Sequence, residues 1–184
     1  MLFSLLFTLF AHATPIVQVE VDPLPYALGG AAGHVRVALP GAEQWTLGAG
    51  LYAQEMPAPL LTLAAKNRGE DWSASLAGVG LFADYYLNNP VSGTHIGAQV
   101  AAHRWSVENP EGDARFASLL VMPRVGYLWL PIDNAGLYLD PWVGVGGTVP
   151  LAGSRTVGDD AFALFPVMFF GALHVGWRFG PRDA

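Results

Sequence analysis

Residues 94–107, THIGAQVAAHRWSV, alternate between two kinds of side chain along the chain. One series is apolar, and the other is small or polar. The first series is Ile96, Ala98, Val100 and Ala102, and the second is His95, Gly97, Gln99, Ala101 and His103. Successive side chains of a β-strand point to opposite faces. This segment is therefore predicted to be a strand with one apolar face and one face of small and polar residues.

The same alternation recurs in other segments of the chain. In residues 137–149, for example, Leu139 and Val143 oppose Asp140 and Gly144. The predicted strands are residues 16–21, 27–38, 45–55, 73–87, 94–107, 116–130, 137–149 and 162–179. The first of these, IVQVEV, is shorter than the roughly 9–11 residues of a membrane-spanning strand. Whether it spans fully stays open.

The connections between these strands fall into two alternating classes. Short turns are predicted at residues 39–44, 88–93 and 131–136. Longer and more polar stretches are predicted at residues 56–72, 108–115 and 150–160. Short turns at one end and long loops at the other are typical of transmembrane β-barrels. The predicted fold is therefore all-β: an eight-stranded antiparallel up-and-down transmembrane β-barrel.

Composition limits the classes of protein that remain. The chain has 184 residues, of which only 13% are charged, about half the usual share of ~25%. It contains no cysteine, which excludes a disulfide scaffold and a cysteine-based metal site. The net charge of −6 argues against nucleic acid as a partner. A membrane protein or an unusually apolar soluble protein remains.

The second face of the predicted strands distinguishes these two. A solvated exterior would carry many charged side chains, but this face is mostly glycine and alanine with isolated charges. Such a face suits a narrow, packed barrel lumen. The apolar face would then contact lipid. The alternative is a soluble exported barrel that encloses its apolar face and binds an apolar ligand there.

Large aromatic residues on the apolar face gather near the short turns and the C-terminal strand. They are Trp45, Tyr85, Tyr127, Trp129, Trp177 and Phe179. Aromatic side chains at one end of a barrel form the girdle that is expected at a membrane–water interface. We therefore predict that these six residues lie at one membrane boundary.

The N-terminus predicts export. Residues 1–10, MLFSLLFTLF, are almost wholly apolar, and AHA follows with small residues at the −3 and −1 positions of a cleavage site. Residues 1–13 are therefore predicted to be a signal peptide, and residues 14–184 to form the barrel domain. The alternative for the first segment is a strand or core helix. Residues 161–177 are long enough for a membrane helix at the short limit, but Pro166 and Gly171 favour a strand.

With its hairpin plan, aromatic girdle and terminal strand ending in Trp177-Arg178-Phe179, the chain resembles the small OmpA/OmpX-like outer-membrane β-barrels of Gram-negative bacteria. The resemblance covers residues 16–179, and a tail at 180–184 follows. It implies a location in the outer membrane, with outer-membrane lipid as the surrounding partner. We expect a monomer.

Charged residues and histidines occur among the lumen-facing positions. The charged residues are Arg36, Asp84, Arg124, Asp140 and Arg178, with Glu20 if the first strand forms. Buried charges are stable when they are paired, so we predict a structural salt-bridge layer that closes the lumen. A gated, porin-like polar path is the alternative. The histidines His34, His95, His103 and His174 are expected to complete hydrogen-bond networks, with a metal site as the lesser alternative.

No catalytic motif is evident. His103 and Ser106 are near in sequence but fall on opposite faces of their strand. We therefore expect no enzymatic activity, no cofactor and no metal, and a structural or surface-interaction role. A lipid A-modifying barrel enzyme is the alternative. Any extracellular ligand would bind the loops at 56–72, 108–115 and 150–160, because loops on rigid barrels carry binding functions.

Overall fold

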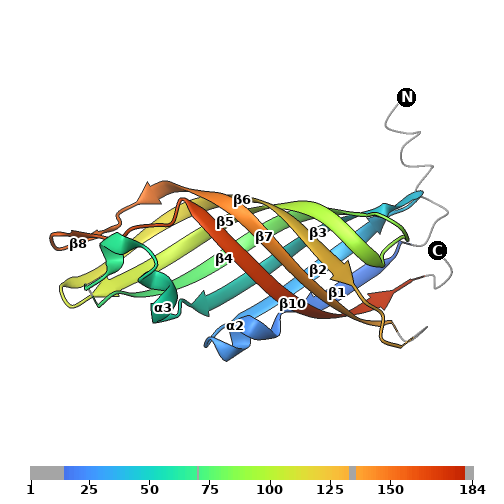
Figure 1. Ribbon diagram of the computed structural model, residues 1–184, viewed down its shortest axis with the longest axis horizontal. Helices are drawn as coiled ribbons and strands as arrows, with labels where there is room; N and C mark the ends of the chain where they lie inside the picture. The colour runs from blue at the N-terminus through green and yellow to red at the C-terminus, as the bar shows by residue number, and fades with distance from the viewer. Residues whose placement is uncertain (1–14, 70, 133–135, 181–184) are drawn as a thin grey trace, which may run out of the picture.

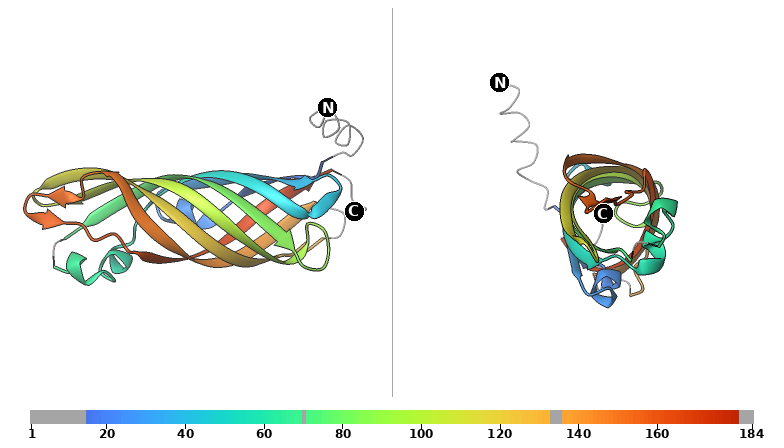
Figure 2. Two further views of the ribbon diagram at one scale, coloured as in Figure 1. Left: turned by 90° about the horizontal axis from the view of Figure 1, so that it is seen from above. Right: turned by 90° about the vertical axis from the view of Figure 1, so that its left-hand side faces the viewer.

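The computed structural model describes residues 15–69, 71–132 and 136–180. Eight of its strands form one closed antiparallel barrel in the order β1-β10-β7-β6-β5-β4-β3-β2 (Figures 1 and 2). Their bounds are β1 (Val17–Val21), β2 (Ala31–Leu39), β3 (Ala42–Glu55), β4 (Ser73–Tyr86), β5 (Gly93–Asn109), β6 (Gly112–Leu128), β7 (Leu137–Gly153) and β10 (Val167–Phe179). The predicted eight-stranded up-and-down barrel is confirmed.

The predicted orientation of alternating side chains is also correct. In β5, His95 and His103 are buried, whereas Ile96 and Val100 are about half exposed on the outer wall. The small residues of the inner face leave room for large side chains of neighbouring strands. At Gly48, for example, a Cβ atom would collide with the ring of Phe82. Glycine in the lumen therefore makes space for the few large residues that fill it.

The predicted long loop at residues 108–115 is wrong. β5 and β6 continue to Asn109 and Gly112, which pair with each other around a tight turn. The Asn109 side chain accepts a hydrogen bond from the Glu111 backbone N–H at 2.9 Å. The polarity of this stretch indicated a loop, but polar residues also suit strands that extend beyond the apolar band.

The first strand forms, but it is short. β1 pairs with β2 on one side and with β10 on the other, which closes the barrel. The chain then leaves the wall in a small helix, α2 (Pro23–Ala27), where Asp22 accepts a hydrogen bond from the Leu24 N–H at 3.0 Å. The predicted strand at 27–38 is therefore wrong in its first residues. Figure 2 shows α2 outside the barrel wall.

The last predicted strand, residues 162–179, begins later than expected. β10 starts at Val167, directly after Pro166. The preceding residues form a small hairpin of β8 (Thr156–Val157) and β9 (Asp160–Ala161), and Phe162 is buried. The predicted loop at 150–160 is correspondingly shorter, because β7 continues to Gly153.

The two ends of the barrel differ in structure. Both described chain ends lie at the short-turn end, and the other end carries α3 (Ala58–Leu61), the 3-10 turn η1 (Ala65–Asn67) and the β8–β9 hairpin (Figure 1). A buried apolar cluster fills the loop end; we call it the apolar plug. Its members are Leu61, Trp72, Ala74, Leu76, Trp105, Val107, Ala114, Phe116, Val157, Phe162 and Met168.

Two sequence predictions concern membrane segments. Among the described residues, none of the helices has the length and apolarity to cross a membrane. The segment 161–177, considered as a helix, instead contributes to β9 and β10. The predicted signal peptide at residues 1–13 lies outside the described residues, as do residues 181–184 of the tail.

Candidate functional site: the charge network of the lumen

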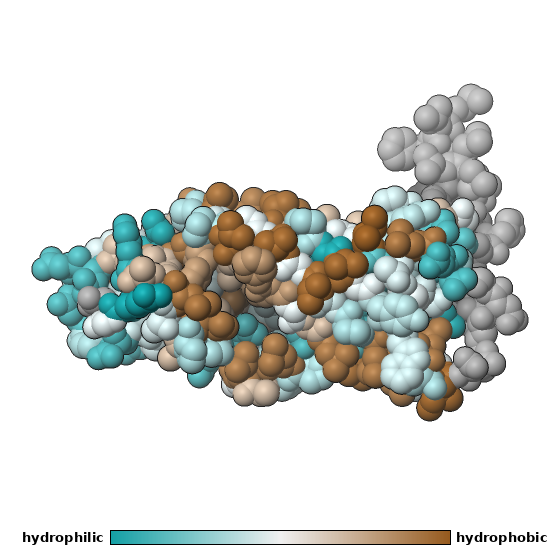
Figure 3. Space-filling model, viewed as in Figure 1, coloured by the Kyte–Doolittle hydropathy of each residue, from teal (hydrophilic) through white to brown (hydrophobic). Residues whose placement is uncertain are grey.

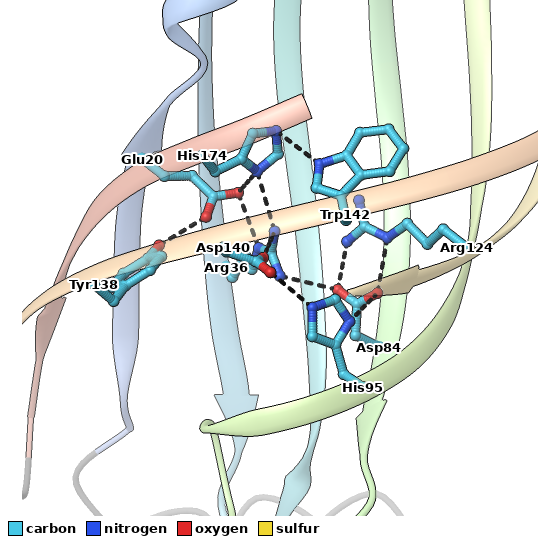
Figure 4. A network of polar contacts seen from close by, with 9 residues as sticks. All are labelled: Glu20, Arg36, Asp84, His95, Arg124, Tyr138, Asp140, Trp142 and His174. Atoms are coloured by element: carbon cyan, nitrogen blue, oxygen red, sulfur yellow. Dashed lines mark hydrogen bonds and ion pairs between the residues drawn. The ribbon is translucent and has the colours of Figure 1, made fainter. Parts of the chain in front are cut away.

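Seven barrel strands each contribute one ionisable side chain to a buried cluster near the short-turn end (Figure 4). We call this cluster the charge network. Its members are Glu20 from β1, Arg36 from β2, Asp84 from β4, His95 from β5, Arg124 from β6, Asp140 from β7 and His174 from β10. Each points inward because it occupies one of the alternate positions of its strand whose side chains face the lumen.

Arg36 lies at the centre of the charge network and is fully buried. Its Nε donates to Glu20 Oε1 at 2.9 Å, and its Nη1 donates to Asp84 Oδ2 at 3.2 Å. Its Nη2 lies 2.7 Å from Asp140 Oδ2. One guanidinium therefore pairs with three carboxylates. Its five N–H donors, spread over a planar group, allow this, whereas the compact ammonium group of a lysine would fit the three carboxylates poorly.

A second guanidinium, that of Arg124, binds Asp84 in a bidentate manner. The contacts are Nε to Oδ1 at 2.8 Å and Nη2 to Oδ2 at 2.5 Å. Both guanidinium groups also lie near the ring of Phe82, at 5.1 Å for Arg36 and 4.4 Å for Arg124. Such cation–π contacts add to the pairing of charges that have lost water.

His95 lies between two of these three carboxylates, those of Asp84 and Asp140. Its Nε2 lies 2.8 Å from Asp140 Oδ1, and its Nδ1 lies 3.6 Å from Asp84 Oδ1. The three carboxylates carry one formal charge more than the two guanidinium groups. A proton on both nitrogens of His95 would make the formal charge of the cluster zero.

His174 extends the network toward the middle of the lumen. Its Nδ1 lies 2.8 Å from Glu20 Oε1, and its Nε2 accepts a hydrogen bond from Trp142 Nε1 at 3.1 Å. The neutral tautomer with the proton on Nδ1 satisfies both contacts. The other Glu20 oxygen accepts from the Tyr138 hydroxyl at 2.7 Å. Each oxygen of this fully buried carboxylate therefore has a partner.

A metal ion fits this cluster poorly. One ligand atom each from Glu20, His34 and His174 lies within 4.8 Å of the other two, which resembles the spacing of a metal site. However, the Arg36 guanidinium already contacts Glu20, and both nitrogens of His174 have partners. A cation would have to displace these contacts and stand beside a positive charge. The donor set thus favours hydrogen bonding.

No protein-family model matches this sequence, and no curated protein matches it. A solved structure of Neisserial surface protein A is 16% identical, covers 89% of this chain and 95% of that chain, and has a TM-score of 0.43. A major outer membrane protein from Thermus thermophilus is 14% identical, covers 91% of this chain and 100% of that chain, and has a TM-score of 0.46. Both of these proteins are outer-membrane β-barrels. The likeness concerns the fold alone.

Three of the predicted lumen residues, His34, His103 and Arg178, lie outside the charge network. The His34 ring stacks on that of His174, with ring centroids 4.5 Å apart. Arg178 has no ion pair within the described residues, and its backbone N–H donates to Gly136 O at 2.8 Å. Arg178 was expected in the same layer as the charge network. However, Glu20 pairs with Gly176 on β10, and Arg178 lies two residues beyond Gly176, closer to the barrel end. His103 lies toward the loop end, where its Nε2 contacts the Tyr52 hydroxyl at 2.5 Å.

Sequence reasoning missed several partners in the network. Tyr138 and Trp142 hydrogen-bond to Glu20 and His174, but neither was predicted. Both share the parity of Asp140 on the same strand, so the alternation rule could have found them.

The predicted girdle residues face outward near the short-turn end. Trp45, Tyr127, Trp129, Trp177 and Phe179 are each about half exposed, and Tyr85 is partly exposed. Trp45 and Tyr85 pack together with ring centroids 5.0 Å apart, and the Tyr85 hydroxyl donates to Gln44 Oε1 at 3.0 Å. An apolar ring with a polar contact toward the turn is the arrangement that suits a membrane interface.

Proposed function

We propose that the protein is an outer-membrane β-barrel with a closed lumen that has a structural or surface-interaction role and no catalytic activity. The observation that carries the proposal is the inverted placement of polarity. Charged residues are buried in the lumen, whereas large apolar residues cover the outer wall. A soluble barrel would place these two classes the other way round.

The outer wall supports membrane insertion. Exposed apolar side chains follow every barrel strand, and Figure 3 shows them over the middle and right of one face, with hydrophilic residues at the loop end. Examples are Val19, Val35, Leu51, Leu81, Val100, Val121, Val143 and Leu173. A continuous apolar wall of this extent is unfavourable in water. It argues against the soluble exported barrel as an alternative.

The lumen supports a non-conducting barrel. The charge network fills it near the short-turn end, and the apolar plug fills it at the loop end. Arg36 and Asp84 have no exposed surface. Fixed, paired charges in a dehydrated layer leave no continuous water path, so the porin-like alternative is disfavoured.

The surroundings of the lumen histidines favour a non-catalytic role. Among the described residues, their polar partners include aspartate, glutamate, tyrosine and tryptophan, and none of their hydrogen bonds is to a serine or threonine. Ser118, which pairs with His103 across the sheet, instead accepts a hydrogen bond from Trp105 Nε1 at 3.0 Å. Ser106 pairs across the wall with Ser75 and Arg115. A lipid A-modifying enzyme of the histidine–serine kind would need those side chains to meet.

The loop end is the surface that remains for a partner. The segment 56–72 carries α3 and η1, and Asn67 fixes it to Ala163 through hydrogen bonds of 3.1 and 2.7 Å. Loops held in one conformation on a rigid barrel can present a defined surface to a partner. We propose an extracellular ligand for the segments 56–72, 108–115 and 150–160.

The test combines location with conductance. The purified chain should migrate differently before and after heating in detergent gels and should fractionate with outer membranes. In planar bilayers it should show no channel openings, and the double variant Asp84→Ala, Asp140→Ala should stay closed as well, because the apolar plug still fills the loop end. Channel openings in the unaltered protein would contradict the closed lumen, and release with periplasmic contents would contradict membrane insertion.

A further inference from the structure

The short β1 leaves a gap in the barrel wall. The last pairing of β1 joins Val21 to Val175 on β10 and to Gly33 on β2. Residues 167–174 of β10 pair with β7 along one edge, and no described strand pairs with their other edge. Helix α2 lies outside the wall beside this gap, about midway along the barrel (Figure 1).

Behind the gap lies a cavity of about 80 Å³ in the lumen, which we call the lateral cavity. Its walls include His34, Gln99, Met122, Trp142 and Ala172. The charge network lies on its short-turn side and the apolar plug on its loop side. The route into this space therefore leads through the wall, from the lipid side, rather than along the barrel axis.

An apolar groove on the outer wall leads to this cavity. The groove encloses about 320 Å³ and is lined mainly by apolar side chains such as Leu28, Leu63 and Phe169. Leu24 and Phe170 line both the groove and the lateral cavity, so the two spaces adjoin. Together they offer an apolar channel that ends in a small polar chamber.

The chemistry of the two parts indicates one kind of occupant. The groove suits an alkyl chain, because its lining is apolar and its mouth faces the lipid wall. The inner chamber has hydrogen-bonding side chains in its lining, including Asp22, His34 and Gln99. Because a single water needs ~10–15 Å³ of such space, the lateral cavity can hold a polar head of a few atoms.

The charges around the chamber favour an uncharged head. Asp22, which is buried beside α2, lines the cavity and would repel an anionic group. Arg36 lies directly behind His174, at 3.2 Å between Nη2 and Nδ1, and would repel a cationic group. A hydroxyl-bearing head can donate to the Asp22 carboxylate and form hydrogen bonds with the polar side chains of the lining without placing a new charge in the lumen.

We infer that the lateral cavity and groove bind a single-chain lipid with an uncharged, hydroxyl-bearing head, which enters from the bilayer between β10 and α2. This inference rests on the membrane insertion proposed above. The chain of the lipid lies in the outer groove, and its head occupies the chamber beside His34 and Gln99.

The test measures equilibrium binding of tritiated 1-monolauroylglycerol to the full barrel in dioleoylphosphatidylcholine nanodiscs. We expect saturable binding of one molecule per barrel, with much weaker competition by dodecanoate and by dodecyltrimethylammonium. Ala172→Phe fills the chamber and should weaken binding at least tenfold. The matched control Leu173→Phe adds a ring one residue further on, on the lipid-facing side, and should bind as the unaltered protein does.

A second variant keeps the test decisive if Ala172→Phe fails to fold. His34→Phe preserves a ring that can stack on His174 but removes both polar nitrogens, and it should weaken binding about tenfold. Binding that is non-saturable, equal in all variants or equally competed by the charged amphiphiles would overturn the inference. Heat-modifiable migration of each sample separates the two proposals, because a chain that never inserts contradicts the proposed function instead.

Discussion

At the end that carries the short turns, the lumen is filled by the charge network, whereas at the loop end it is filled by the apolar plug. The network takes one side chain from each of seven strands, and its contacts depend on direction and on strand register. The plug combines strand residues with residues such as Leu61 and Phe162 from the loop segments, and its contacts are non-directional. We therefore expect the network to tolerate substitution far less than the plug.

The largest effect is expected for Arg36→Met. The variant leaves Glu20, Asp84 and Asp140 buried without their shared cation, which should destabilise the barrel by about 3–5 kcal/mol or prevent folding. Urea unfolding in lipid vesicles, followed by gel migration, measures the change. Arg104→Met is the control, because Arg104 is exposed on the outer face of β5. Equal stability of the two variants would show that the network does not hold the barrel together.

In the apolar plug, Phe162→Ala should cost about 3 kcal/mol. The Phe162 ring packs against Trp72 and Phe116, with centroid distances of 5.4 and 6.1 Å, so its loss leaves a cavity. The same urea titration measures the loss. Phe169→Ala removes a ring that is 82% exposed and should cost less than about 1 kcal/mol. A larger loss for Phe169→Ala would contradict the plug as the stabilising cluster.

A smaller effect is expected where a polar group joins the plug to the loops. Asn67→Ala removes hydrogen bonds to Leu61 and Ala163 and leaves buried backbone groups without partners. We expect a loss of about 1–3 kcal/mol and faster proteolysis within residues 56–72. The exposed Asn88 provides the control as Asn88→Ala. Unchanged proteolysis would show that the segment is held by its apolar contacts alone.

The smallest effect separates two buried tyrosines beside the network. Tyr138 donates to Glu20, whereas the Tyr86 hydroxyl has no hydrogen-bond partner among the described residues. Tyr138→Phe should therefore cost about 1–2 kcal/mol, and Tyr86→Phe should be close to neutral. Both residues are fully buried, so the pair controls for size and burial. A greater loss for Tyr86→Phe would contradict the assignment of partners in the network.

The sequence predicted the filling of the lumen well at the short-turn end of the barrel and poorly at the loop end. Alternation placed Arg36, Asp84, Arg124 and Asp140 on the lumen face, and their positions near the short turns placed them in one layer. The plug was not foreseen, because Leu61 lies in a segment without strand periodicity and because Phe162, predicted to begin the last strand, lies in the loop segment before β10. The lateral gap was also missed, since a five-residue β1 beside a thirteen-residue β10 becomes a gap only once the barrel is closed.

The sequence by itself determined the strands, the two faces and the outward aromatic girdle, because the two-residue period of a strand is a local property of the chain. Only the tertiary structure decided which charges meet, since Arg36 and Asp84 become neighbours through the closure and register of the sheet. It likewise decided that Arg178 stays outside the network and that a cavity opens beside α2. Pairing and enclosure depend on residues far apart in the chain, and periodicity alone does not specify their distances.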